Sequence, residues 1–383
     1  FVFGFVERVC ERGKRRDIAG LAATYGLLLF THLPLAVIGS LALLVYALVR
    51  INGPAKIRKL AKLSLAAGLG LSVSAVYWVT MVAEVGLIGG NQIHRDSSVD
   101  YSLNFLLSTF SPDNLNVWWM NIIALMTLLL FVPAFLLFLK GRASLKPVIV
   151  LTLLAVFMSV PLSRPIWRLL PPVQETQFPW RWLVLISMGG SVLAAAGLPL
   201  LLELGRKKRL LLLGAMAIGV VFTLSHVVRE AVYFSPQRFE KMVTDVRGSA
   251  SINYWLPIWA RGGVRGMTTQ VEAADRSVTV TSWQPEHREF SVAAGPPTEA
   301  RVRTFYYPHW VAKSEAGILS TLPDKDGALL ISLPPDATSV QLDFREPRLT
   351  KLSTISSLGG LIMIGAMMLS VPRKGAKAQS KKA

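Results

Sequence analysis

Long apolar runs separated by short charged stretches dominate the hydrophobic pattern of this chain. A helix needs about 20 consecutive apolar residues to cross the ~30 Å hydrocarbon core of a bilayer. The pattern therefore predicts an α-helical polytopic membrane bundle. Six runs meet or approach this length and are expected to form spans: Leu63–Ala83, Trp118–Leu139, Val148–Leu162, Phe178–Leu202, Leu210–Val227 and Ile355–Val371.

A seventh apolar run, Ile18–Val49, is too long for one straight span, because at 1.5 Å per residue it would extend about 48 Å. Pro34 lies near its middle, lacks a backbone donor and disfavours helical geometry at Leu33. We expect two short helices here, Ile18–Thr31 and Pro34–Val49, joined at His32. The expected total is then about eight membrane segments.

Clusters of basic residues favour this hairpin. Five clusters hold more than half of the 41 Lys and Arg residues, and the hairpin places all five on one side of the membrane. Lys and Arg are enriched in cytoplasmic loops, so this side is predicted to be cytoplasmic, with both termini on it, as in a bacterial inner-membrane protein. The clusters are Arg8–Arg16, Arg50–Lys62, Lys140–Lys146, Arg206–Arg209 and Arg373–Lys382.

The same topology explains the net charge of +18 without a nucleic-acid partner, and we expect none. The single cysteine, Cys10, excludes an internal disulfide and a multi-cysteine zinc site. The chain opens at Phe1 in a charged stretch rather than with a methionine. We therefore expect a fragment that lacks upstream membrane helices.

A different pattern governs residues 229–348, which are predicted to lie outside the cytoplasm. Short runs there alternate between apolar and polar residues, and Gly and Pro breakers separate them. The five runs expected to form strands are Arg276–Trp283, His287–Ala293, Arg301–Tyr307, Ala328–Leu333 and Ser339–Phe344. Such spacing indicates a small antiparallel β-sandwich inserted in the bundle. The expected order is a basic segment (1–17), the bundle (18–228), the β-rich domain (229–348), a final span (355–371) and a basic tail (372–383) that could contact lipid.

Several short motifs resemble those of bacterial membrane proteins labelled "6-pyruvoyl-tetrahydropterin synthase-related" and, more remotely, C-type (GT-C) membrane glycosyltransferases. The most specific are F-P-W-R-W before a span and Y-Y-P-H-W in the β-rich domain. The motifs lie at Thr31–Pro34, Tyr77–Glu84, Asn104–Leu106, Gln177–Leu183, Asn253–Trp259, Tyr306–Trp310 and Asp326–Pro334.

The pterin label implies a zinc site made of three histidines, but the five histidines of this chain are scattered and none are paired at metal-binding spacing. The GT-C resemblance implies transfer of a sugar from a polyprenyl-phosphate donor at the external face. It also implies a catalytic carboxylate in the first external loop, and no segment of this chain corresponds to that loop.

Arg181 is the main candidate for binding the donor phosphate. Arginine inside a membrane segment is costly and usually finds an anion, which a guanidinium can hold through two hydrogen bonds. Arg164 and Arg168 could join it from the preceding loop. The alternative is that Arg181 reaches the lipid headgroups between Trp180 and Trp182, which would then form an ordinary aromatic belt.

His32 and Glu84 are the candidate catalytic groups, since both are titratable and lie at the external ends of apolar segments. His32 could instead satisfy carbonyls freed by Pro34, and Glu84 could be a solvated interfacial residue. Asp96, Asp100 and Asp113 in a long external loop could supply a base or hold a divalent cation, although a solvated loop is the simpler interpretation. Possible sugar-stacking rings are Trp180, Trp255 and Trp310, with core packing as the alternative for the last two.

We therefore expect a GT-C-like glycosyltransferase module that takes a polyprenyl-phosphate-linked sugar. The alternative is a non-catalytic scaffold for assembly of the cell envelope, in which the β-rich domain binds a partner. A transporter is less favoured, because the spans are poor in charge and no internal repeat is visible.

Overall fold

The structure is a computed structural model that describes residues 1–51, 53, 55–88, 100–108, 120–125, 145–230, 235–248, 256–260 and 267–369. The chain divides into two compact units. The helical unit comprises Phe1–Trp78, Asp96–Tyr233 and Ile355–Ala383. The sheet unit comprises Val79–Arg95 and Phe234–Thr354.

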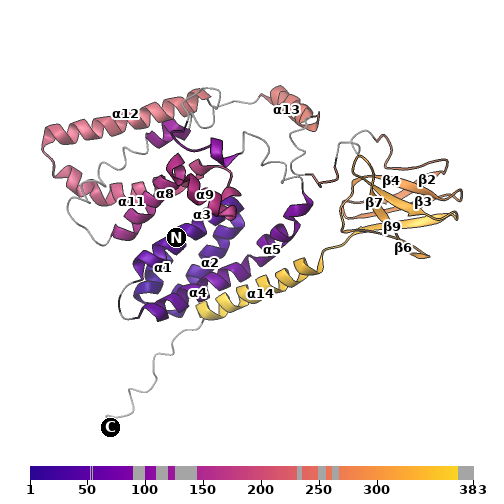
Figure 1. The fold of residues 1–383 in the computed structure, drawn as a ribbon, viewed down its shortest axis with the longest axis horizontal. Helices are drawn as coiled ribbons and strands as arrows, with labels where there is room; N and C mark the ends of the chain where they lie inside the picture. Colours follow the sequence, from indigo (N-terminus) through magenta and orange to yellow (C-terminus); the bar gives the residue numbers. More distant parts are fainter. Residues whose placement is uncertain are drawn as a thin grey trace, which may run out of the picture. The chain divides into compact units, whose positions relative to one another are not determined.

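Helices form most of the described chain (Figure 1). Short 3₁₀ turns lie between some of the helices. Two of them are Pro161–Ser163, which follows α8, and Pro179–Trp182 (η6), which precedes α11. The helices are α1 (Val2–Glu11), α2 (Arg15–Thr31), α3 (Leu33–Arg50), α4 (Lys56–Val73), α5 (Ala75–Glu84), α8 (Lys146–Ser159), α9 (Arg164–Leu169), α10 (Pro171–Gln174), α11 (Leu183–Leu202), α12 (Arg206–Glu230), α13 (Pro236–Gly248) and α14 (Arg348–Leu369).

Four helical segments in the described ranges are long and apolar enough to cross a membrane. The number rises to six if each of two sharply bent helix pairs forms one span, against the eight or so expected from the sequence. The expected span Trp118–Leu139 lies largely outside the described residues. Only 120–125 of this span are described, and they are helical. The four segments are Leu33–Arg50, Pro179–Leu202, Arg206–Ser225 and Arg348–Leu369.

The predicted hairpin between Ile18 and Val49 is confirmed as two helices, although α2 itself is not among the four apolar segments. The chain leaves α2 at His32, whose backbone is extended (φ −169°, ψ 118°), and Pro34 lies in the first turn of α3. Proline is tolerated there because the first helical N–H groups have no partner within the helix. His32 is therefore fixed at a tight turn between two helices.

The prediction of one helix over Leu63–Ala83 is wrong, because the chain bends by 70° between α4 and α5 at Ser74. The hydroxyl of Ser74 donates to the carbonyl of Gly70 (2.9 Å), and the N–H of Val76 donates to Oγ of Ser357 in α14 (3.0 Å). A helix can bend where side chains take over its backbone hydrogen bonds.

The prediction for Val148–Leu162 also needs correction. Helix α8 ends at Ser159, and the chain then turns by 88° into α9. Val160 precedes Pro161 and is extended (ψ 159°), as expected for the residue before a proline. The segment 163–177, expected to be a loop, is instead largely helical, since it contains α9 and α10.

Small residues bring α2 and α4 close together. A Cβ atom added to Gly70 would lie 3.0 Å from the carbonyl oxygen of Ala22 and 3.3 Å from the backbone nitrogen of Gly26. Ala66 is fully buried one turn before Gly70. Pairs of small residues four positions apart are typical of helix contacts in membranes.

An aromatic cluster anchors the segment 101–106 to the helices that follow α8. Tyr101 stacks on Trp167 (5.4 Å between centroids), and Phe105 meets the same ring edge-on (5.7 Å). The indole N–H of Trp167 donates to the carbonyl of Met158 (3.1 Å). Trp167 and Phe105 are fully buried, so this part of the predicted external loop belongs to the core of the helical unit.

The sheet unit contains two antiparallel sheets, of orders β1-β4-β8-β7 and β2-β3-β9-β5-β6. Buried residues of both sheets, among them Phe290, Val302, Ile331 and Leu342, form one hydrophobic core, as in the expected sandwich. The strands are β1 (Val271–Ala273), β2 (Val278–Trp283), β3 (His287–Val292), β4 (Thr298–Phe305), β5 (Trp310–Ser314), β6 (Gly317–Leu319), β7 (Thr321–Pro323), β8 (Ala328–Leu333) and β9 (Thr338–Phe344).

Two features of this region differ from the expectation of strands alone. Residues Pro236–Gly248 form helix α13, whose start is marked by the hydroxyl of Ser235 accepting from the N–H of Arg238 (3.2 Å). The short strands β1, β5, β6 and β7 were also not predicted.

Candidate functional site

In the helical unit, His32 and Arg181 interact electrostatically. His32 is exposed at the turn between α2 and α3, whereas Arg181 lies in η6, directly before α11. Partial burial and the positive charge of Arg181 together lower the pKa of His32. A neutral imidazole can accept a proton, so the turn carries a potential base close to a cation.

Backbone and ring contacts fix the orientation of Arg181. Its Nη1 donates to the carbonyl oxygen of Thr176 (2.6 Å), and the guanidinium carbon lies 4.8 Å from the centroid of the Phe178 ring. Phe178 also stacks on Trp180 (4.9 Å between centroids). The guanidinium is half-buried and has no carboxylate within ion-pair distance in the described part of the chain. A preoriented cation of this kind suits an anionic ligand.

The indole N–H groups of Trp180 and Trp182 are buried and have no hydrogen-bond partner among the residues that the structure describes. Trp182 is 1% exposed and belongs to the core of the helical unit. Trp180 is only partly buried, and its ring is stacked on Phe178. Of the three expected sugar-stacking rings, Trp180 alone lies beside Arg181 in η6.

The two other arginines predicted to bind phosphate lie on α9. Arg164 donates from Nη2 to the carbonyl of Ser102 (3.2 Å), and its guanidinium carbon lies 5.6 Å from the centroid of the Phe105 ring. Arg168 is exposed. Arg164 therefore helps to hold the segment 101–106, whereas the charge of Arg181 acts on the pKa of His32.

The second predicted catalytic group, Glu84, belongs to the sheet unit. One carboxylate oxygen accepts from the phenol of Tyr307 (2.7 Å), and the other lies 3.0 Å from Nε2 of His309. Burial and the neighbouring carboxylate raise the pKa of Tyr307. Both partners come from the Y-Y-P-H-W motif, and neither was predicted as a partner of Glu84.

One of the predicted sugar-stacking rings, Trp310, belongs to the core of the sandwich. Trp310 is 7% exposed and packs in the sandwich core, where the guanidinium carbon of Arg288 lies 4.6 Å from its ring centroid. Its ring therefore offers no open face to a sugar. Trp255 lies outside the described residues.

A half-buried cation accompanies Trp310. The guanidinium of Arg288 lies between the rings of Trp283 (4.5 Å) and Trp310, and it donates to the hydroxyl of Thr304. Burial lowers the pKa of Arg288 to about 10, so it stays charged at neutral pH. The two indoles stabilise this charge through cation–π contacts, which indicates a structural role in the core.

No group of three or more His, Cys, Asp or Glu side chains in the described ranges could hold a metal ion. Of the three loop aspartates, Asp96 and Asp113 lie outside those ranges. Asp100 accepts from the N–H of Ser102 (2.8 Å) and caps a 3₁₀ turn.

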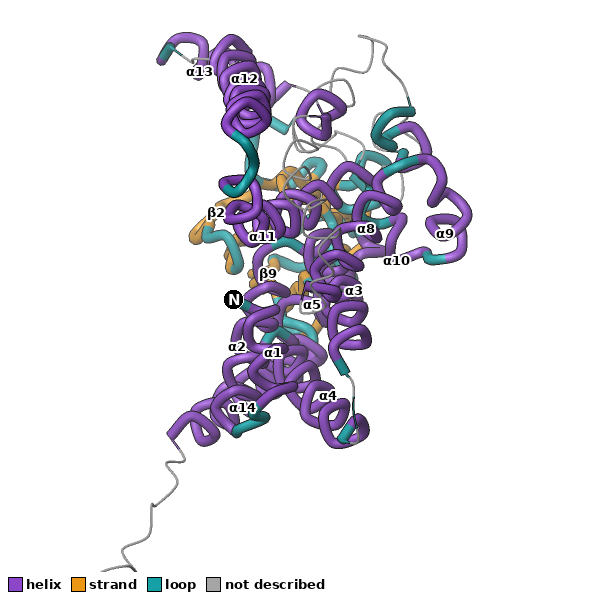
Figure 2. The backbone as a smooth tube through the Cα atoms, turned by 90° about the vertical axis from the view of Figure 1, so that its left-hand side faces the viewer, coloured by secondary structure: helices purple, strands orange, loops and turns teal. Residues whose placement is uncertain are grey.

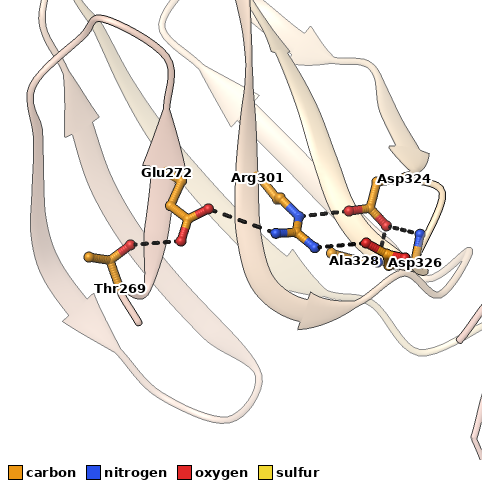
Figure 3. A network of polar contacts seen from close by, with 6 residues as sticks. All are labelled: Thr269, Glu272, Arg301, Asp324, Asp326 and Ala328. Carbon is orange, nitrogen blue, oxygen red and sulfur yellow. Dashed lines mark hydrogen bonds and ion pairs between the residues drawn. The ribbon is translucent and has the colours of Figure 1, made fainter. Parts of the chain in front are cut away.

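A cluster of carboxylates elsewhere in the sheet unit is already held by a cation (Figure 3). Nε of Arg301 donates to Asp324 (2.7 Å), and its terminal nitrogens lie near Asp326 (3.5 Å) and Glu272 (3.8 Å). This network connects β1, β4 and the turn between β7 and β8, which makes it a structural feature of the sandwich.

Comparison of the chain with protein-family models, with curated proteins and with solved structures finds no match.

Proposed function

We propose that this chain is the membrane module of a GT-C-like glycosyltransferase that takes a sugar from a polyprenyl phosphate at the extra-cytoplasmic face. The half-buried guanidinium of Arg181, oriented by the carbonyl of Thr176 and the ring of Phe178, carries the proposal, and its charge also lowers the pKa of His32. Each residue was selected from the sequence on separate grounds, and each lies at an end of an apolar helical segment.

The roles follow from the chemistry of the two groups. The guanidinium of Arg181 holds the phosphate of the donor lipid and stabilises the negative charge that the phosphate gains as the bond to the sugar breaks. An acceptor hydroxyl attacks the anomeric carbon, and the neutral ring of His32 takes the hydroxyl proton. The lowered pKa of His32 keeps its imidazole neutral and ready for this step.

Trp180 and Arg164 have supporting roles in the site, whereas Glu84 has none. Trp180 provides an aromatic face beside the phosphate, and Arg164 positions the segment 101–106. Glu84 is left out of the reaction, because Tyr307 and His309 already occupy both of its oxygens.

The test is copurification of polyprenyl-phosphate lipid, quantified by mass spectrometry, for the full-length protein and its Arg181→Ala variant. The control is Arg168→Ala, which removes the same charge from the exposed side chain on α9. We expect enrichment of the lipid in the wild type and the control, and a loss of about tenfold in Arg181→Ala, since a charge-assisted hydrogen bond contributes about 1.5–3 kcal/mol.

Equal lipid in all three proteins, or none in any, would overturn the donor site. Support would then move to the alternative, a non-catalytic scaffold of the cell envelope anchored by its helices. The His32→Ala variant separates binding from reaction: we expect it to retain the lipid but to lose sugar transfer to an acceptor.

A further inference from the structure

The first four helices enclose a cavity of about 180 Å³ in the helical unit. Helices α3 and α4 both pack on α2, whereas their described residues make little contact with each other. The cavity is therefore a groove lined by residues of α2, α3 and α4 and by Val6 of α1. Figure 2 shows the backbones of these four helices. It lies apart from η6, which carries Arg181.

The lining of the groove is mostly hydrocarbon, with the hydroxyls of Tyr25, Ser40 and Ser64 as its polar side-chain groups. Leu43, Leu44, Ala47 and Leu48 line one wall at helical spacing, and residues of α4 from Leu60 to Ala67 line the other. The hydroxyls of Tyr25 and Ser40 in the lining hydrogen-bond to each other (2.8 Å). These two groups therefore do not need a polar ligand as a hydrogen-bond partner. Such a lining suits an apolar guest.

The rim of the groove is open and apolar. Leu44 is 55% exposed and Leu48 is 58% exposed on α3, and Leu60 is 51% exposed on α4. Helix α3 is one of the segments long and apolar enough to span a membrane. A chain of lipid could therefore enter from the side without crossing water.

The charge at the end of the groove identifies the headgroup. Lys56 is exposed in the first turn of α4 and lies one turn before Leu60 on the same face. It has no carboxylate within ion-pair distance in the part of the chain that the structure describes. By contrast, Arg50 is held by Glu7 (2.6 Å) and Glu11 (3.3 Å).

We infer that this groove binds an anionic phospholipid, with one acyl chain between α3 and α4 and the phosphate at Lys56. A lysine near a bilayer surface adds about 1 kcal/mol to the attraction for an anionic lipid. The charge of Lys56 selects a negative headgroup, and the apolar groove selects an acyl chain.

The test uses the full protein in phosphatidylcholine nanodiscs that contain a trace of phosphatidylglycerol with a photoreactive diazirine in one acyl chain. We expect crosslinks on the groove residues of α3 and α4. Lys56→Gln should reduce this labelling about fivefold. Arg58→Gln, which removes a charge from the opposite face of α4, should leave it unchanged.

A second pair of variants tests the acyl-chain site independently of charge. Ala67→Phe fills the groove and should abolish labelling there, whereas Ala61→Phe on the exposed surface of α4 should not. Equal losses of labelling in Lys56→Gln and Arg58→Gln, or full labelling of Ala67→Phe, would overturn the site. Preferential labelling of the groove by a photoreactive polyprenyl phosphate would overturn the choice of ligand. All four variants should copurify as much polyprenyl phosphate as the wild type, because that lipid depends on Arg181. Failure of this site and failure of the proposed function are therefore distinguishable.

Discussion

The phenol of Tyr307 donates a 2.7 Å hydrogen bond to the carboxylate of Glu84, which lies 223 positions earlier in the chain. The bond joins the end of α5 to the segment before β5 within the sheet unit. Glu84 is only 24% exposed and also meets His309, so this long-range contact holds a charged group in a partly dry environment.

Tyr307→Phe should remove this bond at almost constant volume. We expect the opening free energy of β5 and β9 to fall by about 1–2 kcal/mol, because the bond is made to a charged group. Hydrogen–deuterium exchange of the full chain, resolved by peptide, measures this quantity. Tyr306→Phe is the matched control, since the Tyr306 ring packs on Trp259, and it should change the opening by less than about 0.5 kcal/mol.

The same bond predicts an alkaline limit to the stability of the sheet unit. Burial and the carboxylate of Glu84 raise the pKa of Tyr307 above its unfolded value of about 10. The unfolded state therefore loses the phenolic proton first, so stability is complete below about pH 10 and falls as the pH rises above it. Exchange measured between pH 8 and pH 11 should show a shallower fall in Tyr307→Phe; parallel curves for variant and wild type would contradict the assignment.

Arg301→Gln should destabilise the sandwich by about 1–3 kcal/mol, because Asp324 is 11% exposed and would lose its charged partner. Burial opposes ionisation of Asp324, but hydrogen bonds from Ala328, Arg301 and Asp326 outweigh it and hold the pKa below its ordinary value. The contribution of Asp324 is therefore present above about pH 4 and is lost as the pH falls through the folded pKa. Hydrogen–deuterium exchange in β8 measures both the loss of stability and its pH dependence. Arg303→Gln, on the exposed face of β4, should change neither quantity.

Gly70→Ala and Gly68→Ala should have opposite effects on the helical unit. Alanine is the better helix former by about 0.5–1 kcal/mol, and a Cβ at Gly68 would meet nothing within 4 Å. At Gly70 the Cβ would press on backbone atoms of α2, at a cost of about 1–3 kcal/mol. Thermal unfolding in one detergent should rank Gly68→Ala at or above the wild type and Gly70→Ala below it. Equal melting temperatures would show that α2 and α4 can separate without penalty.

Arg181→Gln should raise the pKa of His32, because the substitution removes the positive charge that opposes protonation of the ring. Acylation by diethyl pyrocarbonate requires the neutral ring, so the reactivity of His32 in the variant should begin at a higher pH. Peptide mass spectrometry distinguishes His32 from the other histidines. Arg168→Gln should not change the pH dependence of His32 acylation. A shift as large as that in Arg181→Gln would point to a general effect of charge.

Features set by local chemistry could be predicted from the sequence. Pro34 and the length of its apolar run predicted the helix break at His32, and period-two alternation predicted five of the nine strands in the described sheets. The bend at Ser74 could not be predicted, because it depends on the hydroxyl of Ser357 in a distant helix. Helix α13 had a usable signal in Ser235 followed by Pro236, which is typical of a helix start.

The candidate site shows the same division. Arg181 and His32 could be selected singly, since charged groups at the ends of apolar runs stand out in a sequence. Their interaction, and the contact of Glu84 with His309 across 225 positions, depend on tertiary structure that local patterns do not encode. Core packing and ligand contact stayed open for Trp310, because an aromatic residue in a short strand looks the same in both; the structure places it in the core.

The bend between α4 and α5 also constrains the order of events during biosynthesis. At this bend Ser356 and Ser357 accept hydrogen bonds from Ser72 and Val76, which lie 284 and 281 positions earlier in the chain. A ribosome releases these serines only after it has made every strand of the sandwich. Until then Val76 lacks its partner in α14, so this corner of the bundle is completed only after the β-rich region has been synthesised.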